Sequence, residues 1–263
     1  MAFSAKVKFL GAAAMALTFW VGAAQAASCG KDASGFEAWK QEFAQEAKAA
    51  GVKNKGLQAL AGATYATATI KADRAVKKAF SGDVNSFMKR RGGATIISKG
   101  RSLKKSNAAL FADIERRYGV PAGPLIAIWG METGFGAGMG KQNTISAIVT
   151  LAYDCRRPAF FTPHALAALK LVDRGVLSAS TVGAAHGEYG HTQFLPGNIL
   201  NYGVGNMNLK DKATALASTA NFLRAHGYRG GRASANLGAI AGWNSASVYQ
   251  QAIVIMADAI DGE

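Results

Sequence analysis

Apolar side chains recur at steps of three or four residues through most of the chain, a spacing that places them on one face of a helix. Five such segments open with residues that commonly start a helix: the capping box Ser34–Glu37, Asn107, Thr162-Pro163, Asp211, and Ser245 or Ser247. Their expected inward residues are Phe36, Trp39 and Phe43; Leu110, Ile114 and Tyr118; Leu166, Leu169 and Val172; Leu216, Ala220 and Leu223; and Val248, Ala252, Ile255 and Ala259. The pattern predicts a mostly α protein, with Gly119 and Gly227 ending two of the helices.

Strand-like alternation is rare in this chain. Ala94–Ser98 is the one short β-like stretch, and its composition fits a helix equally well. Two glycine-rich segments, Gly130–Gly140 and Gly183–Gly205, interrupt the helical pattern and lack the spacing of a phosphate-binding loop. Between helices, such loops favour the walls of a cleft over flexible linkers.

The first residues have the pattern of an export signal. Lys6 and Lys8 precede the apolar run Phe9–Ala24, and Ala24-Gln25-Ala26 fits the small-x-small site of a signal peptidase. We therefore expect residues 1–26 to be a signal peptide that is removed on export to the periplasm.

The mature chain would then begin near Ala27 and form one domain over residues 27–263. Two other interpretations stay open at this point. One is an uncleaved membrane anchor, and the other is a lipid attached to Cys29, although Ala26 stands where a lipobox has Leu. No later stretch is long and apolar enough to span a membrane, so we expect no integral membrane segment after cleavage.

The chain is basic. Its 263 residues include 30 Lys and Arg against 16 Asp and Glu, a formal charge of +14, and loss of Lys6 and Lys8 with the signal leaves +12. Such a charge favours polyanionic partners: acidic cell-wall polymers, acidic lipid or nucleic acid. Export makes nucleic acid the poorest of these, and no arginine-rich or aromatic-interleaved stripe supports it.

Cys29 and Cys155 are the two cysteines, and an even pair in an oxidising compartment suggests one disulfide. The histidines lack a metal-ligand spacing such as HExxH, so we expect neither a metal site nor a cofactor. These histidines are His164, His186, His191 and His226.

One carboxyl stands out in the apolar segment after Gly119. If Pro124 starts a helix, Leu125, Ile128, Trp129 and Glu132 share one face, and Glu132 is its only polar member. Partial desolvation at the lip of a core raises the pKa of a carboxyl, as a general acid at neutral pH requires. By pattern alone, a glutamate turned to solvent at the helix end is the alternative.

Four blocks in order resemble the lytic murein transglycosylases typified by membrane-bound lytic transglycosylase B. In the first, Val120-Pro121 precedes an apolar run and Gly130-Met131-Glu132-Thr133-Gly134-Phe135-Gly136, similar to the family's Gly-x-Glu-[Ser/Thr]-x-[Phe/Trp]-Gly. The first block continues through Cys155–Phe161, which carries an Arg pair, and the other blocks are Gly190–Pro196, Ala220–Tyr228 and Trp243–Tyr249. Together they span nearly all of the expected mature chain.

The resemblance implies a lysozyme-like fold of the α+β type, mostly α, with a deep cleft between helical lobes. It implies non-hydrolytic cleavage of the β-1,4 bond between N-acetylmuramic acid (MurNAc) and N-acetylglucosamine (GlcNAc) in peptidoglycan. One catalytic residue, Glu132, would first protonate the leaving oxygen and then accept the proton of the muramic 6-hydroxyl, which closes a 1,6-anhydro ring. Ordinary glycosidases use two carboxylates for hydrolysis.

The resemblance also implies substrate-binding residues. Gln193 matches the cleft glutamine, and Arg156 and Arg157 match an arginine pair suited to peptide or lactyl carboxylates. Phe160, Phe222 and Trp243 stand where the family often has Tyr and are expected to stack on sugar faces. For the aromatics the alternative is a place in the core, and for the arginines a solvated surface charge.

The chain departs from the family pattern before Gly190. Ala184 replaces a serine thought to steer the sugar's acetamide, and Glu188 is a new acidic residue. We interpret Glu188 as a hydrogen-bond acceptor at the cleft edge. As a second catalytic carboxylate it would instead favour hydrolysis.

We therefore expect an active lytic transglycosylase that acts as a monomer on peptidoglycan glycan strands, with other cell-wall enzymes as further candidate partners. Two alternatives are a hydrolytic muramidase and an inactive peptidoglycan-binding protein on the same fold. A basic protein that binds membranes or nucleic acid is the remaining class.

Overall fold

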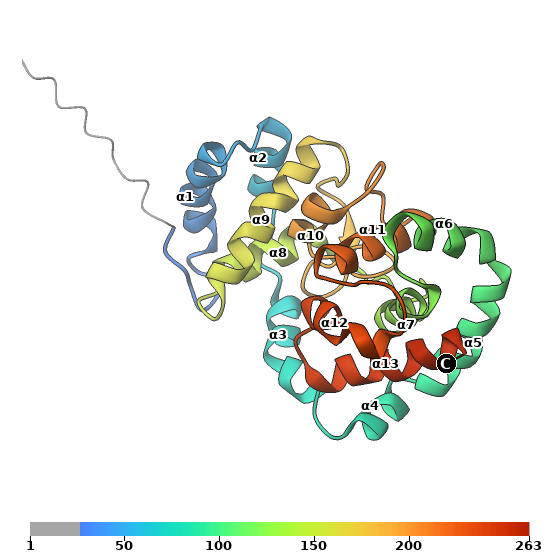
Figure 1. Ribbon diagram of the computed structural model, residues 1–263. Helices are drawn as coiled ribbons and strands as arrows, with labels where there is room; N and C mark the ends of the chain where they lie inside the picture. The colour runs from blue at the N-terminus through green and yellow to red at the C-terminus, as the bar shows by residue number, and fades with distance from the viewer. Residues whose placement is uncertain (1–26, 263) are drawn as a thin grey trace, which may run out of the picture.

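The computed structural model describes residues 27–262, apart from the side chains of residues 76–79. The expected signal sequence, residues 1–26, lies outside the described residues. The described chain folds into thirteen α-helices, one short 3-10 helix and one two-stranded sheet (Figure 1). The prediction of a mostly α protein is confirmed.

The helices fall into two groups that lie side by side (Figure 1). Helices α1, α2, α8 and α9 pack together as the small lobe, and α4–α7 pack with α11–α13 as the large lobe. The helices are α1 Phe36–Ala49, α2 Asn54–Ala61, α3 Thr67–Ala79, α4 Val84–Arg90, α5 Gly93–Ser106, α6 Ala108–Tyr118, α7 Ala122–Thr133, α8 Thr144–Tyr153, α9 Pro158–Asp173, α10 Pro196–Tyr202, α11 Lys212–Ala225, η1 Ala233–Asn236, α12 Leu237–Trp243 and α13 Ser247–Asp261. Across residues 27–262, none of these helices is long and apolar enough to cross a membrane.

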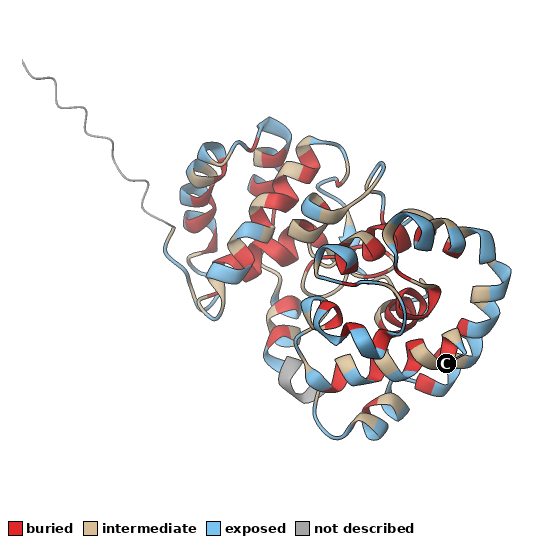
Figure 2. Cartoon of the chain, viewed as in Figure 1, coloured by how far each residue is buried: buried red, intermediate tan, exposed pale blue. Residues whose placement is uncertain are grey.

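Helix α7 lies in the middle of the large lobe and is buried along its length (Figure 2). Glu132 is its only residue that is not buried. A helix that is apolar all round needs neighbours on every side, and α5, α6, α11 and α13 supply them. Pro121 precedes the helix in an extended conformation, and Gly134 ends it with φ +58°. Pro124 was expected to start the helix but is its third residue, where the first turn needs no N–H donor.

Two glycines allow neighbouring helices to approach α7 closely. A Cβ on Gly100 of α5 would lie 2.9 Å from Ile126, closer than real Cβ contacts come. A Cβ on Gly123 of α7 would overlap the carbonyl of Ala257 in α13. Helices α7 and α13 therefore pack backbone against backbone at Gly123, and the backbone of α5 packs on the side chain of Ile126 at Gly100.

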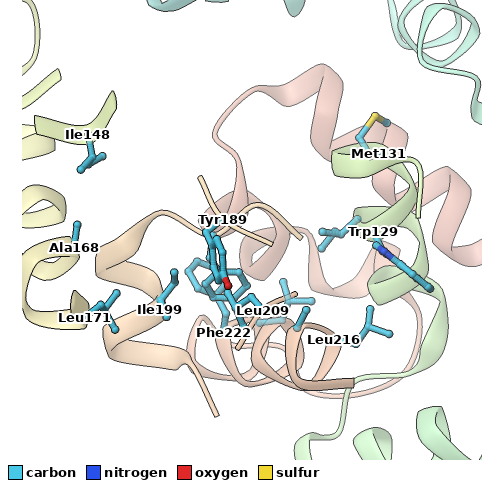
Figure 3. Close-up of a cluster of buried hydrophobic side chains, with 14 of the residues drawn as sticks. Trp129, Met131, Ile148, Ala168, Leu171, Tyr189, Ile199, Leu209, Leu216 and Phe222 are labelled. Atoms are coloured by element: carbon cyan, nitrogen blue, oxygen red, sulfur yellow. The ribbon is translucent and has the colours of Figure 1, made fainter. Parts of the chain in front are cut away.

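The buried core runs from α7 into the small lobe. Figure 3 shows Trp129 and Met131 of α7 at one end, Tyr189 and Phe222 in the middle, and Leu171 of α9 at the other end. Because the two lobes share this core, the segment that carries Tyr189 is held from both sides.

Cys29 and Cys155 form a disulfide, so the predicted pairing is confirmed. Beside it, the Gly30 N–H donates to the Tyr153 carbonyl at 3.0 Å, and the Cys155 N–H donates to the Gly30 carbonyl at 3.0 Å. The start of the described chain is thereby tied to the turn between α8 and α9.

Two predicted helix starts are wrong. Ser34 does not cap α1, because its hydroxyl donates to Asp32 at 2.6 Å and Gly35 is the N-cap residue. Helix α9 begins at Pro158 rather than at Thr162-Pro163, since Pro158 already supplies the fixed φ that suits a first helical position.

The other predicted starts agree with the structure. Asn107 precedes α6, and Asp211 caps α11 by accepting the Thr214 N–H at 2.8 Å. Helix α13 begins at Ser247, but Ile255 was wrongly placed on its inward face and is 42% exposed. Ala94–Ser98, left open between strand and helix, is helical within α5.

The strands β1 (Gln142–Asn143) and β2 (Val182–Gly183) pair antiparallel. Two residues per strand are too few to show alternation, so the sequence did not predict them. The sheet joins the glycine-rich segment after α7 to the loop that follows β2, and that loop leads into the site.

Candidate active site

The side chain of Glu132, in the last turn of α7, lines a cavity of about 220 Å³. Three parts of the chain enclose it: the end of α7, the segment from β2 into the first turn of α10, and the end of α12 with the residue after it. Its lining residues are Glu132, Glu188, Gln193, Phe194, Leu195, Asn198, Trp243 and Asn244. The sequence thus placed Glu132, Glu188, Gln193 and Trp243 at what proves to be one cavity.

Two donors converge on one carboxyl oxygen of Glu132. The Tyr249 hydroxyl donates to Oε1 at 2.6 Å, and the Trp243 indole N–H donates to the same atom at 3.3 Å. Burial raises the pKa of Glu132, those two hydrogen bonds oppose the rise, and the charge of Glu188 adds to it. The protonated carboxyl is therefore favoured to a higher pH than in an ordinary glutamate.

Tyr249 is a site residue that sequence reasoning missed. It lies in the first turn of α13, almost fully buried, and its pKa is raised well above the ordinary value by burial and by the charge of Glu132. The family-like Trp243–Tyr249 block pointed to this residue. No periodicity distinguishes it from a core tyrosine, because it is also packed in the core.

Gln193 sits on a kinked turn at the cavity wall. Its backbone is in the left-handed region, φ +58°, and its side-chain N–H donates to the Gly190 carbonyl at 2.8 Å. The paired backbones of Tyr189 and Phe194 close the turn. The amide is therefore held in place before any ligand arrives.

His191 connects this turn to helix α7. Its Nδ1 accepts the Trp129 indole N–H at 3.0 Å, and its carbonyl accepts the Thr133 hydroxyl at 2.6 Å. Burial lowers the pKa of His191, which favours the neutral ring that such an acceptor requires. A Cβ on Gly136 would overlap the His191 ring, so the loop after α7 passes directly over it.

Glu188 reaches the cavity from the loop after β2. Its carboxylate accepts the His186 backbone N–H at 2.9 Å and pairs with His186 Nδ1 at 3.2 Å. On the other side of the ring, His186 Nε2 lies 3.8 Å from the carboxylate of Asp73 in α3.

The arginine pair is not on the cavity wall. Arg156 and Arg157, at the turn before α9, both form ion pairs with Asp73, which is 1% exposed. Burial alone would raise the pKa of Asp73, but the hydrogen bonds of the two arginines outweigh it and lower the pKa. Arg74 joins the cluster at 2.9 Å from Asp73.

The two phenylalanines proposed for sugar stacking have different surroundings. Phe222 is 3% exposed and packs edge-on against Trp243 at 5.1 Å between ring centroids, so it buttresses the cavity rather than lining it. Phe160 is half exposed beside Arg157, whose guanidinium lies 5.7 Å from its ring centroid.

The helical lobes and the Glu132 carboxyl at the cavity define a lysozyme-like protein. Residues 35–236 match the family described as the Transglycosylase SLT domain, and the chain belongs to this family.

Individual relatives agree with this assignment. The chain is 33% identical over 118 residues to membrane-bound lytic murein transglycosylase B of Escherichia coli (strain K12). That match covers 42% of this chain and only 33% of the relative, so it spans a third of the relative's length.

Solved structures match over more of the chain. SltB3 of Pseudomonas aeruginosa, in complex with NAG-anhNAM-pentapeptide, is 27% identical with a TM-score of 0.77, covering 86% of this chain and 80% of that one. The Escherichia coli lytic transglycosylase Slt35, in complex with calcium, is 18% identical with a TM-score of 0.75, covering 89% and 96%. The Slt35 likeness shows the fold.

Proposed function

We propose that this protein is a peptidoglycan lytic transglycosylase that cleaves the MurNAc-β-1,4-GlcNAc bond and releases 1,6-anhydromuropeptides. The observation that carries the proposal is Glu132 at the cavity, with its acid form favoured by burial and its carboxylate form stabilised by Tyr249 and Trp243. A single group that must donate a proton and then accept one needs both its protonated and its ionised form to be accessible at the working pH.

The reaction then runs in two proton transfers. Protonated Glu132 donates to the glycosidic oxygen as its bond to the muramic C1 breaks, and the GlcNAc end leaves as an alcohol. The Glu132 carboxylate next accepts the proton of the muramic 6-hydroxyl, whose oxygen attacks C1 and closes the anhydro ring. Glu132 ends protonated, as it began, and no water is consumed.

The cavity wall suits the alignment that this ring closure requires. Gln193, Asn198 and Asn244 offer amide donors and acceptors to the hydroxyls and acetamide of a sugar. Trp243 offers the edge of an aromatic surface while its N–H is directed at Glu132. The SltB3 structure with an anhydro-sugar ligand supports an anhydro product for this family member.

A hydrolytic muramidase is the second candidate, because Glu188 lines the same cavity as Glu132. Digestion of purified sacculi followed by mass spectrometry separates the two, since an anhydro-muropeptide is one water lighter than its hydrolysed counterpart. Release of reducing-end muramic acid alone by the wild type would overturn the transglycosylase proposal.

We place the enzyme in the periplasm as a monomeric domain, residues 27–263, after removal of residues 1–26. The export pattern of the N-terminus and the Cys29–Cys155 disulfide support this location, since disulfides persist in oxidising compartments. Arg156 and Arg157 are proposed to meet the carboxylates of stem peptides outside the cavity, with the exposed Phe160 beside them.

Tyr249→Phe is expected to move the alkaline limb of the pH–rate profile to higher pH by about one unit. In the wild type the Tyr249 hydrogen bond stabilises the carboxylate form of Glu132, so its loss raises the pKa of Glu132. Hydrogen bonds to charged groups contribute roughly 1.5–3 kcal/mol. Because the first step needs protonated Glu132, a raised pKa extends activity upward. Turnover at neutral pH is expected to fall about tenfold, since the carboxylate formed in that step loses its donor.

The measurement is the rate of turbidity loss of sacculi across pH, with Tyr118→Phe at the end of α6, a half-buried tyrosine that is not part of the cavity lining, as the matched control. An alkaline limb that stays in place or moves down in Tyr249→Phe would contradict this assignment of Tyr249.

Gln193→Ala is expected to lower turnover more than it lowers wall binding. The amide held by Gly190 aligns the sugar, whereas the positive charge of the whole molecule supplies the attraction to acidic wall polymers. Pull-down on sacculi is compared with turbidity loss, with the exposed Gln45→Ala as control. A Gln193→Ala protein that binds poorly but keeps its rate per bound enzyme would exclude the aligning role.

A further inference from the structure

Among the side chains that the structure describes, the cavity lining includes a second carboxylate and no side chain of opposite charge. Its lining residues include Glu132 and Glu188, and none of them is Lys, Arg or His. Two carboxylates at one small cavity repel each other when both are ionised.

The backbone around Glu188 is fixed. The Ala184 N–H donates to the Glu188 carbonyl at 2.8 Å, and a Cβ on Gly183 would overlap that carbonyl. Gly187, with φ +85°, packs so closely on α8 that a Cβ there would lie 3.1 Å from Ile148. The loop cannot easily carry Glu188 out of the cavity.

The charge of Glu188 is matched from behind by His186. Both carboxylate oxygens are engaged, one by the His186 backbone N–H at 2.9 Å and the other by Nδ1 at 3.2 Å. Burial opposes protonation of the His186 ring, but the hydrogen bond and charge of Glu188 and the charge of Asp73 outweigh it and raise the pKa of His186.

Asp73 completes the row of alternating charges. It faces the far nitrogen of His186 at 3.8 Å and is itself ionised against Arg156 and Arg157. The order from the protein surface to the cavity is arginines, Asp73, His186, Glu188 and then the sugar site. We call Asp73, His186 and Glu188 the charge relay.

We propose that Glu188 is a second catalytic residue, a carboxylate oriented by His186 and Asp73, which stabilises the positive charge that forms on the muramic ring as the glycosidic bond breaks. His186 is a positioning residue that acts through Glu188. The inference rests on the proposed function of the cavity.

The chemistry favours an electrostatic role over a proton-transfer role. Cleavage of a glycosidic bond passes through an oxocarbenium-like state, and a fixed anion in a site shielded from water stabilises such charge without reorganising. Each oxygen of Glu188 already accepts one hydrogen bond from His186, which fixes the orientation of the carboxylate at the cavity. The bonds made and broken stay those of the two-step reaction, and Glu188 is unchanged at the end.

Glu188 also acts on Glu132 at a distance. Its charge disfavours ionisation of Glu132, the opposite of the effect of the Tyr249 hydrogen bond. The groups that face Glu188 are His186 from its own loop and Glu132 from α7, with Asp73 of α3 and Arg157 behind His186. Removing the Glu188 charge must then lower the pKa of Glu132, and removing the Tyr249 hydroxyl must raise it.

The test uses the mature chain with Glu188→Gln, Glu188→Asp and His186→Gln, and it has two independent readouts. Steady-state cleavage of glycan fragments gives kcat and KM, and NMR titration of carbon-13-labelled glutamate side chains gives the pKa of Glu132 without turnover. For Glu188→Gln we expect kcat to fall about tenfold or more with KM nearly unchanged. The pKa of Glu132 is expected to fall by about one unit, moving the alkaline limb down.

Glu188→Asp keeps the charge and is expected to retain more kcat than Glu188→Gln, which separates loss of charge from loss of folding. His186→Gln is expected to lower kcat in the wild-type background and to have little further effect in Glu188→Gln, because it acts through that residue. Equal losses in both backgrounds would show a merely structural role for His186.

Other outcomes overturn the proposal for Glu188. A rise in KM with kcat and the Glu132 pKa unchanged would make it a ground-state sugar contact only. A switch from reducing-end products in the wild type to none in Glu188→Gln would make it the base of a hydrolase. If the wild type cleaves no peptidoglycan, the proposed function fails, while the Glu132 titration still reports whether the two carboxyls interact.

Discussion

Replacing Glu132 with Gln is expected to abolish cleavage of sacculi while leaving the protein folded and bound to the wall. Gln is nearly isosteric, and its side-chain oxygen can still accept from Tyr249 and Trp243 as the carboxyl does. It can neither donate nor accept the proton that the reaction moves twice. General acid–base catalysis is worth about 10²–10⁴-fold, so turbidity loss is expected to slow by at least roughly that factor.

The same variant carries a stability prediction whose sign follows from burial. The pKa of Glu132 is raised in the folded state, so its contribution to stability is complete below the ordinary glutamate pKa and is lost as the pH rises through the folded pKa. Because Gln cannot ionise, Glu132→Gln does not lose stability in this way as the pH rises. At neutral pH its urea midpoint is expected to equal or exceed that of the wild type.

The matched control is Glu115→Gln, an exposed change on α6 that is expected to leave both rate and stability unaltered. A Glu132→Gln protein that is folded, bound to sacculi and still releases muropeptides at a rate near wild type would remove Glu132 from the mechanism.

Helix α7 shows most clearly which features could be predicted from the sequence. The apolar run, the single carboxyl and the following Gly134 are local features, so the sequence predicted the helix and the placement of Glu132 at its end. What periodicity could not indicate was that the helix is buried on every side. That depends on α5, α6, α11 and α13, which come from distant parts of the chain.

The charge relay could not be predicted for a related reason. Asp73 and His186 lie far apart in the sequence, and no pattern within either segment marks them as partners. Asp73 looks like one more polar position on α3, although it is 1% exposed. The sequence singled out Glu188 as a departure from the family pattern, but its partner His186 was considered only as a metal ligand.

Aromatic residues show a further limit. Phe222 and Trp243 occupy similar positions in family-like blocks, yet Phe222 is buried and Trp243 reaches the cavity. Burial of an aromatic ring gives the same sequence signal whether the ring faces a core or a sugar. The rings of Phe194, Phe222 and Trp243 pack against one another, and only the folded structure shows that Trp243 and Phe194 reach the cavity while Phe222 does not.

Removing the disulfide with the double change Cys29→Ser and Cys155→Ser is expected to cost about 4–5 kcal/mol of unfolding free energy. The bridge joins residues 126 positions apart, and closing so long a loop restricts the unfolded chain strongly in the chain-entropy description. Equilibrium unfolding in urea measures the change, and reduction of the wild type with dithiothreitol is expected to give a similar loss.

The bridge acts on the unfolded state more than on the site. The cavity residues come from α7, the segment after β2 and the end of α12, none of which contains either cysteine. The rate per folded molecule is therefore expected to stay near wild type in the double variant, while the folded fraction falls as urea or temperature rises. Two outcomes would contradict this account: a loss below about 1 kcal/mol, far short of the chain-entropy value, or two free thiols found by mass spectrometry in the exported protein. A lipid on Cys29 would do the same, since that sulfur could then form no bridge.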